Sequence, residues 1–295
     1  MSQANQVLDQ YSSECVVDNQ LGVHAALLHA EEFERYEDKY LVPIKYQDEL
    51  LELLYQKSRP HYLTSDTRFL TIQSSYYESP QFHSFRDHFL AKPYRYKLRT
   101  RIYGSNGKFL DDEAAHIELK TKEGETSRKF RFKVDRHDLT RLHQFLPIRM
   151  SAALGALNET IPGEELSRRA KNISRLVLEN ELTPVCNVTY QRQAFERKGV
   201  RVTLDTGIES HLLLPVQSAA LFEGDVQIRE QAQAMVQRFL EKPHALLEVK
   251  HRGLVPKWLE SFTLARTSGK SSFSKYCYAM TTHLLRKNRN HASSL

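Results

Sequence analysis

Short segments in which basic and apolar side chains alternate constrain the fold of this chain more than any other feature. In the segment 94–103, for example, Lys97, Arg99 and Arg101 alternate with Leu98. Successive side chains of a β-strand point to opposite faces, so this pattern predicts a strand with one charged and one apolar face. The same alternation recurs in segments 34–42, 116–122, 128–134, 185–196, 200–205 and 244–251. The sequence therefore predicts several amphipathic strands in one antiparallel sheet.

The charged faces of these strands carry far more basic than acidic residues. The basic residues are Arg35, Lys39, Lys97, Arg99, Arg101, Lys120, Lys122, Lys129, Arg131, Lys133, Arg192, Arg201, Lys250 and Arg252, and the acidic ones are Glu37, Glu118, Asp205 and Glu248. A single such strand is equally typical of a sheet with one solvated face. Across all strands, however, like charges roughly 7 Å apart cost on the order of 2 kcal/mol per pair at an effective dielectric near 20. We therefore expect an anionic partner to compensate them.

A barrel with a basic interior explains this distribution of charge best. We expect Lys97, Arg99, Arg101, Lys129 and Arg131 to share one enclosed interior that binds a linear chain of phosphates, because Arg and Lys donors suit phosphate oxygens. On the other side of the same strands, apolar side chains should point outward under helices, and the clearest are Leu98, Phe130, Phe132 and Val202. Duplex nucleic acid is excluded as a partner because it is too wide for a barrel lumen.

The complete pattern predicts an α+β fold, an antiparallel β-barrel flanked by helices and closed by a C-terminal helix. We expect further strands at 68–77 and 211–222, helices at 45–57, 80–90, 227–240 and 271–287, and a helical insertion at about 135–181. One domain should span residues 31–283, between an N-terminal lead-in (1–30) and a basic C-terminal tail (284–295).

Composition and motifs exclude several other classes of protein. No window is apolar enough for a membrane-spanning helix, and no secretory leader is recognisable, so we expect a cytoplasmic protein. The three cysteines lie far apart without CxxC spacing, which argues against a disulfide framework or a structural zinc site. The chain has neither a P-loop nor a Rossmann glycine motif. The few carboxylates on the basic faces are instead candidate ligands for Mg²⁺ or Mn²⁺ beside phosphate oxygens.

Eight short motifs occur in the order seen in a known family. They are Arg35-Tyr-Glu37-Asp-Lys39-Tyr40, Arg99-Thr-Arg101-Ile-Tyr103-Gly104, Glu118-Leu-Lys120-Thr, Lys129-Phe-Arg131-Phe, Tyr190-Gln-Arg192-Gln-Ala-Phe195, Val200-Arg201-Val-Thr-Leu-Asp205-Thr, Leu247-Glu248-Val-Lys250 and Ser272-Phe-Ser274-Lys275-Tyr276. This order resembles the catalytic domain of the vacuolar transporter chaperone (VTC) proteins, which is similar to the wider triphosphate tunnel metalloenzyme, or CYTH-like, superfamily. The resemblance covers residues 33–280.

The resemblance implies a polyphosphate polymerase, which transfers the γ-phosphate of ATP to a growing phosphate chain with the help of Mn²⁺ or Mg²⁺. Carried over by position, the catalytic residues would be Lys39, Arg99, Arg101, Lys120, Arg192, Arg201 and Lys275. The residues that bind the phosphates would be Lys129, Arg131, Tyr190, Lys250 and Ser274. Metal would be held by Glu248, Glu37 and Glu118.

Two positions depart from the patterns of related proteins. Arg35 stands where the superfamily's hydrolases place another glutamate, and Ser272 replaces a basic residue that some polymerases have. The first departure argues against the hydrolase branch, and the second indicates that the exit for product differs. Two alternatives to a polymerase stay open. The tunnel could serve a tripolyphosphatase or nucleoside triphosphatase, or a non-catalytic module that binds polyphosphate or RNA.

Overall fold

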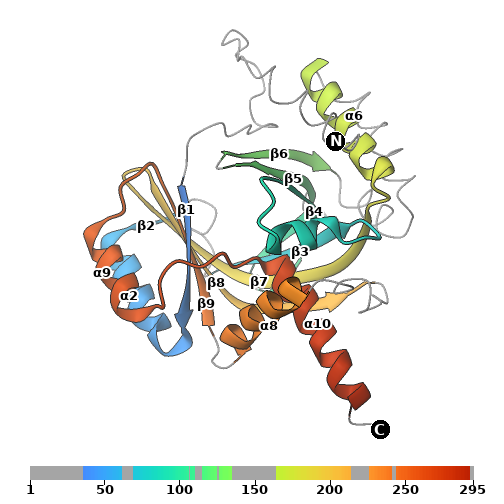
Figure 1. Ribbon diagram of the computed structural model, residues 1–295. Helices are drawn as coiled ribbons and strands as arrows, with labels where there is room; N and C mark the ends of the chain where they lie inside the picture. Colours follow the sequence, from blue (N-terminus) through green and yellow to red (C-terminus); the bar gives the residue numbers. More distant parts are fainter. Residues whose placement is uncertain are drawn as a thin grey trace.

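The chain folds into one strongly curled antiparallel sheet with helices on both of its faces (Figure 1). The computed structural model describes residues 36–61, 69–105, 107–109, 115–124, 126–134, 164–213, 226–240 and 244–292. The predicted lead-in and the first part of the predicted insertion, residues 135–163, lie outside these ranges. Within them, the α+β class is confirmed, and the curled antiparallel sheet forms a half-barrel that is consistent with the predicted tunnel.

Nine strands form this sheet in the described part of the chain, in the order β1-β9-β8-β7-β3-β4-β5-β6, with the short β2 paired to β7. All neighbouring strands run antiparallel. The strands are β1 (Tyr36–Pro43), β2 (Arg59–Pro60), β3 (Leu70–Glu78), β4 (Tyr94–Ser105), β5 (Ala115–Glu123), β6 (Thr126–Val134), β7 (Thr183–Arg197), β8 (Val200–Leu212) and β9 (His244–His251).

The helices pack on the two faces of the sheet in separate groups (Figure 1). They are the 3-10 turn η1 (Ile44–Tyr46), α2 (Gln47–Lys57), α3 (His83–Phe89), α6 (Glu164–Glu179), α8 (Val226–Leu240), α9 (Lys257–Arg266) and α10 (Lys275–Ala292). Helices α2, α6 and α9 cover the convex face, while α3, α8 and α10 lie at one end of the concave face.

Apolar side chains of the strands are buried on the convex face, as the alternation predicts. Leu98 and Phe130 pack with Ile173 and Leu176 of α6 in one cluster. Val202 packs in a second cluster, whose helical members are Leu50 and Leu54 of α2 and Leu259 and Phe262 of α9. The side chain of Phe132 lies outside the described ones. Because the two clusters bury one face of these strands under helices, the opposite face of the same strands points toward the interior.

Part of the concave face is also apolar, and α10 covers it. Ile72 and Tyr76 of β3 and Val188 of β7 pack against Tyr276 and Met280 of this helix. A neighbouring cluster is formed by Leu41 of β1, Leu246 of β9, Val236 of α8, and Phe273 and Tyr278. The predicted closing helix therefore fills one end of the concave face and leaves the other end to the charged residues.

The segment 267–274 before α10 lies along the outer edge of β1. The backbone N–H of Ser271 donates to the carbonyl of Lys39 at 2.7 Å, and Tyr40 forms an isolated bridge with Lys270. The salt bridge from Lys270 to Asp38, 2.9 Å long, holds the segment there. The segment thus satisfies the carbonyl of Lys39 on the outer side of β1, and β1 and β6 are the two end strands of the sheet.

One predicted break needs correction, and one helix was not predicted. The predicted break between strands 200–205 and 211–222 is wrong, because β8 continues from Val200 to Leu212. Gly207 has φ +58°, and the ladder with β7 shifts register beside it, so a bulge lets the strand continue. Helix α9 was not predicted. The division of the chain into lead-in, domain and tail stays a prediction.

Candidate functional site

Four cations converge on one carboxylate on the wall formed by β4, β5 and β6. Glu118, which is 1% exposed, lies 2.7 Å from Nη2 of Arg99 and 3.6 Å from Nη1 of Arg101. Its other oxygen lies 2.9 Å from Nζ of Lys129 and 3.3 Å from Nε of Arg131. We call these five residues the basic wall. The antiparallel register produces it, because Glu118 is paired with Arg99 on one side and Arg131 on the other.

The basic wall keeps a surplus of positive charge. Burial by itself would raise the pKa of Glu118, but Arg101, Arg99 and Lys129 hold it well below its usual range. Burial lowers the pKa of Lys129 to about 7, although Glu118 favours the charged ammonium. One carboxylate balances only one of the guanidinium and ammonium groups around it. The wall is therefore built to accept further negative charge.

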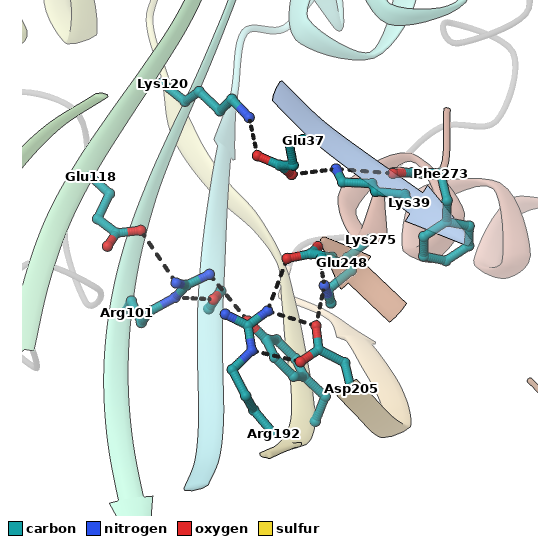
Figure 2. A network of polar contacts seen from close by, with 12 residues as sticks. Glu37, Lys39, Arg101, Glu118, Lys120, Arg192, Asp205, Glu248, Phe273 and Lys275 are labelled. Atoms are coloured by element: carbon teal, nitrogen blue, oxygen red, sulfur yellow. Dashed lines mark hydrogen bonds and ion pairs between the residues drawn. The ribbon is translucent and has the colours of Figure 1, made fainter. Parts of the chain in front are cut away.

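The opposite wall carries cations that are matched by acids (Figure 2). Arg192 donates from Nε and Nη2 to the two oxygens of Asp205, at 2.6 and 2.7 Å, and its Nη2 also lies 3.2 Å from Glu248. Lys275, the first residue of α10, lies 2.6 Å from Asp205 and 3.1 Å from Glu248. Burial disfavours the charged form of Lys275, but Asp205 and Glu248 raise its pKa above the usual value.

Tyr190 connects the two walls. Its hydroxyl lies 3.2 Å from Nη2 of Arg101, and that guanidinium also donates from Nε to Ser74 at 3.1 Å. The cations of Arg192 and Lys275 lie 5.4 and 4.7 Å from the centre of the Tyr190 ring. The aromatic face and the hydroxyl therefore hold three cations that would otherwise repel one another.

Glu37 and Lys39 of β1 face Lys120 of β5 across the concave face (Figure 2). Glu37 lies 3.2 Å from Lys39 and 3.4 Å from Lys120. Lys39 also donates to the carbonyl of Phe273 at 3.4 Å. Burial would raise the pKa of Glu37, but the two lysines keep it below its ordinary value. These contacts link the two end regions of the sheet through side chains.

The remaining predicted residues lie at the borders of this arrangement. Ser274 accepts a hydrogen bond from Nζ of Lys97 at 2.9 Å, just before α10. Arg201 and Lys250 are cross-strand partners on β8 and β9, and Lys250 is paired with Glu37. The structure thus brings the predicted site residues to one concave face. Their individual roles stay predictions.

Two buried carboxylates hold neighbouring groups of the site in place, a role that the sequence did not indicate. Asp205 is fully buried beneath Arg192 and Lys275, although the sequence only placed it on the charged face of a strand. Glu78 is fully buried as well, and it accepts hydrogen bonds from backbone N–H groups of Ser84 and Phe85 and from the hydroxyl of Tyr276 at 2.6 Å. A lone acid at the end of an apolar strand was the available signal for Glu78.

The three predicted metal ligands do not form one group. The described residues contain no cluster of three or more His, Cys, Asp or Glu that could hold a metal ion. Glu118 fits a metal least, because four cations surround it. Glu37 and Glu248 each contact two cations, so a metal at these carboxylates would replace those contacts. Glu248 acts to raise the pKa of Glu37, and Mg²⁺ binds to one or two carboxylates with phosphate oxygens, so these two carboxylates are the better candidates.

Comparison with known proteins places this geometry in a family. The family model described as the VTC domain matches residues 34–284, and no curated protein matches the chain. The solved structures similar to this chain include a protein from Bacillus halodurans provisionally assigned as an adenylate cyclase, with 12% identity, a TM-score of 0.42, and coverage of 82% of this chain and 97% of that one.

A conserved hypothetical protein from Pyrococcus furiosus is similar at 11% identity, with a TM-score of 0.38 and coverage of 83% of this chain and 99% of that one. In the described residues, no helix is long and apolar enough to cross a membrane. The family model covers most of the chain, and its match includes every residue of the basic wall and the opposite acid-matched wall. The chain therefore belongs to the VTC domain family.

Proposed function

We propose that this protein is a metal-dependent polyphosphate polymerase that transfers the γ-phosphate of ATP to the end of an inorganic polyphosphate chain. The observation that carries the proposal is the basic wall, where Arg99, Arg101, Lys129 and Arg131 share a single carboxylate. A surplus of guanidinium and ammonium groups along one wall suits consecutive phosphates. Membership of the VTC domain family supports the same substrate class.

The two walls would have different roles in binding the phosphates. The basic wall would bind and align the phosphates, and Arg192, Lys275 and Lys39 would approach them from the opposite side. Phosphoryl transfer depends mainly on positioning and on stabilising charge, so the protein needs little covalent chemistry. Tyr190 and Asp205 keep Arg192 and Lys275 in fixed orientations before substrate arrives, which reduces the reorganisation needed at the transition state.

Glu37 and Glu248 would hold a divalent cation together with phosphate oxygens of the substrate. A bound Mg²⁺ or Mn²⁺ would neutralise charge that develops on the transferred group. Lys39, Lys120, Arg192 and Lys275 pair with these carboxylates in the absence of substrate and would be free to contact phosphate when the cation binds.

Incubation with ATP and Mn²⁺ tests the proposal directly. Long phosphate chains should accumulate, and gel electrophoresis would detect them, while a phosphate assay measures hydrolysis in the same sample. Arg99→Gln should weaken binding of tripolyphosphate at least tenfold. Arg266→Gln is a matched control, because it removes one positive charge from the convex side, where Arg266 pairs with Glu49. Release of free phosphate without polymer would favour the tripolyphosphatase, and binding without turnover would favour the non-catalytic module.

A further inference from the structure

Two segments that meet at one end of the sheet carry an excess of exposed basic side chains. One runs from the end of α2 through β2, and the other forms the turn between β7 and β8. The exposed cations of these segments are Lys57, Arg59, Arg197 and Lys198. We call these four residues the rim.

Backbone contacts bring the rim together from two distant parts of the chain. Arg59 is the cross-strand partner of Glu196, which precedes Arg197 at the end of β7. The guanidinium of Arg197 donates to the backbone carbonyl of Lys57. Glu196 is the only acid in residues 57–61 and 196–201, so the rim keeps a surplus of positive charge.

The surface of α2 and α9, in contrast, mixes the two signs of charge. Residues 45–56 contain one basic and three acidic residues, and residues 257–266 contain two basic residues and one acidic residue. Arg266 of α9 pairs with Glu49 of α2 at 3.1 Å. Neighbouring like charges repel one another, so a basic surface such as the rim suits an anionic partner.

The rim continues the basic concave face. A row of cross-strand partners runs from β2 to β9 and consists of Arg59, Glu196, Arg201 and Lys250. Cross-strand partners point to the same face of a sheet. Because Arg201 and Lys250 belong to the predicted phosphate site, an anion on the rim would lie next to anions bound in that site.

The rim and the exposed part of the basic wall lie on different sides of the sheet. Lys120 of β5 and Lys129 of β6 are 47% and 40% exposed, and β3 and β4 separate their strands from β7. Helix α10 packs near the start of β7, at Val188, whereas the rim lies at the end of this strand. A phosphate chain on the rim therefore leaves Lys120 and Lys129 accessible to ATP.

From the surplus of charge and its continuity with the concave face, we propose that the rim binds the part of the polyphosphate chain that extends out of the concave face. The inference rests on the proposed function and adds a second binding surface for the product. In each transfer, an oxygen of the chain's terminal phosphate bonds to the γ-phosphorus, the bond from that phosphorus to the β-phosphate oxygen breaks, and ADP leaves past Lys120 and Lys129. The lengthened chain then moves outward over the rim.

Arg59→Gln combined with Lys198→Gln tests the inference, because it removes two cations of the rim and keeps every residue of the two walls. Wild type and variant would be titrated with tripolyphosphate and with a linear chain of several tens of phosphates, without nucleotide or metal. The variant should bind the long chain at least fivefold more weakly and tripolyphosphate less than twofold more weakly. The slope of log affinity against log salt should become shallower for the long chain only, by about one unit or more, because fewer counterions are released.

The matched control is Lys45→Gln combined with Arg266→Gln, which removes the same charge from the surface around Tyr46. An equal loss of long-chain affinity in control and rim variant would overturn the inference, and so would an equal loss for both ligands. Retained affinity for tripolyphosphate shows that the rim variant is folded. A wild-type protein that binds neither ligand contradicts the proposed function, and the inference with it.

Single-stranded RNA of comparable length separates two classes of polyanion. RNA should bind to the wild-type protein at least tenfold more weakly than the long polyphosphate chain, because nucleosides separate its charges and the concave face must accept them as well. Binding of RNA at least as tight as that of polyphosphate would assign the rim to nucleic acid and overturn the inference.

Discussion

Asp205 and Arg192 form a two-point ion pair on neighbouring strands, with Nε and Nη2 of the arginine 2.6 and 2.7 Å from the two carboxylate oxygens. The carboxylate is fully buried and also pairs with Lys275. Such a pair fixes the plane of the guanidinium, which a single contact cannot do. Asp205 thus orients two cations of the site from β8.

Asp205→Asn tests this positioning role. The change leaves Arg192 and Lys275 with less buried negative charge, and breaking a buried ion pair typically costs about 3–5 kcal/mol of unfolding free energy. Denaturant unfolding should show the loss of stability. Turnover at saturating substrate should fall more than tripolyphosphate affinity, because the cations remain but lose their orientation. The matched control is Glu49→Gln at the exposed pair with Arg266, which should leave both stability and turnover unchanged. Equal losses of affinity and turnover would contradict a role in orientation.

Glu248 and Glu118 should respond differently to removal of their charge. Glu248→Gln should leave much of the metal-free tripolyphosphate affinity intact and reduce Mn²⁺-dependent turnover by about 100-fold or more, because a cation would lose a ligand. The Glu118→Gln protein should keep the wild-type dependence of turnover on Mn²⁺. Its unfolding free energy should fall, since four cations would then lack a counter-charge. Turnover measured against Mn²⁺ concentration distinguishes the two. A Glu248→Gln protein with wild-type activity and metal dependence would refute the assignment of Glu248.

Lys129 should take up a proton when phosphate binds. Burial lowers its pKa to about 7, so above that pH the free protein holds a growing fraction of neutral amine. A bound phosphate favours the ammonium, and at pH 8 this requires a proton from the buffer. Calorimetry of tripolyphosphate binding in buffers with different ionisation enthalpies should show uptake at pH 8 and little at pH 5.5. The difference should disappear in Lys129→Arg, whose side chain stays charged at both pH values. Equal proton uptake by the wild-type and Lys129→Arg proteins would show that another group takes up the proton.

Tyr276→Phe tests how the first turn of α10 is held in place. The hydroxyl of Tyr276 donates to the carboxyl group of Glu78, whose pKa is raised by burial, and leaving one partner of a buried hydrogen bond unsatisfied costs about 1–3 kcal/mol. Stability should fall by about that amount. Glu78→Gln and the double variant complete a thermodynamic cycle, in which the losses should be less than additive. Strictly additive losses would mean that the two side chains do not act together.

Local patterns were sufficient for most of the strands and for which basic residues share a face, but not for the continuity of β8 or for the short β2. The alternation of Lys97, Leu98 and Arg99 determines which side chains share a face, because a strand has a period of two whatever its neighbours are. The same reasoning placed Leu98 and Phe130 under a helix, as the structure confirms. The alternation did not predict helix α9, a ten-residue helix that begins directly after Pro256.

The tertiary structure decided how the charges are distributed between walls. The sequence predicted a mainly basic interior with four acids, but not which cations those acids would meet. Pairing between strands and the packing of α10 set Asp205 and Glu248 beside Arg192 and Lys275. These contacts join residues far apart in the chain, so no local period encodes them. The sequence by itself determined an antiparallel sheet with one basic face. The curling of that sheet and the docking of α10 decided which acids meet which cations, because long-range packing alone brings those strands and that helix together.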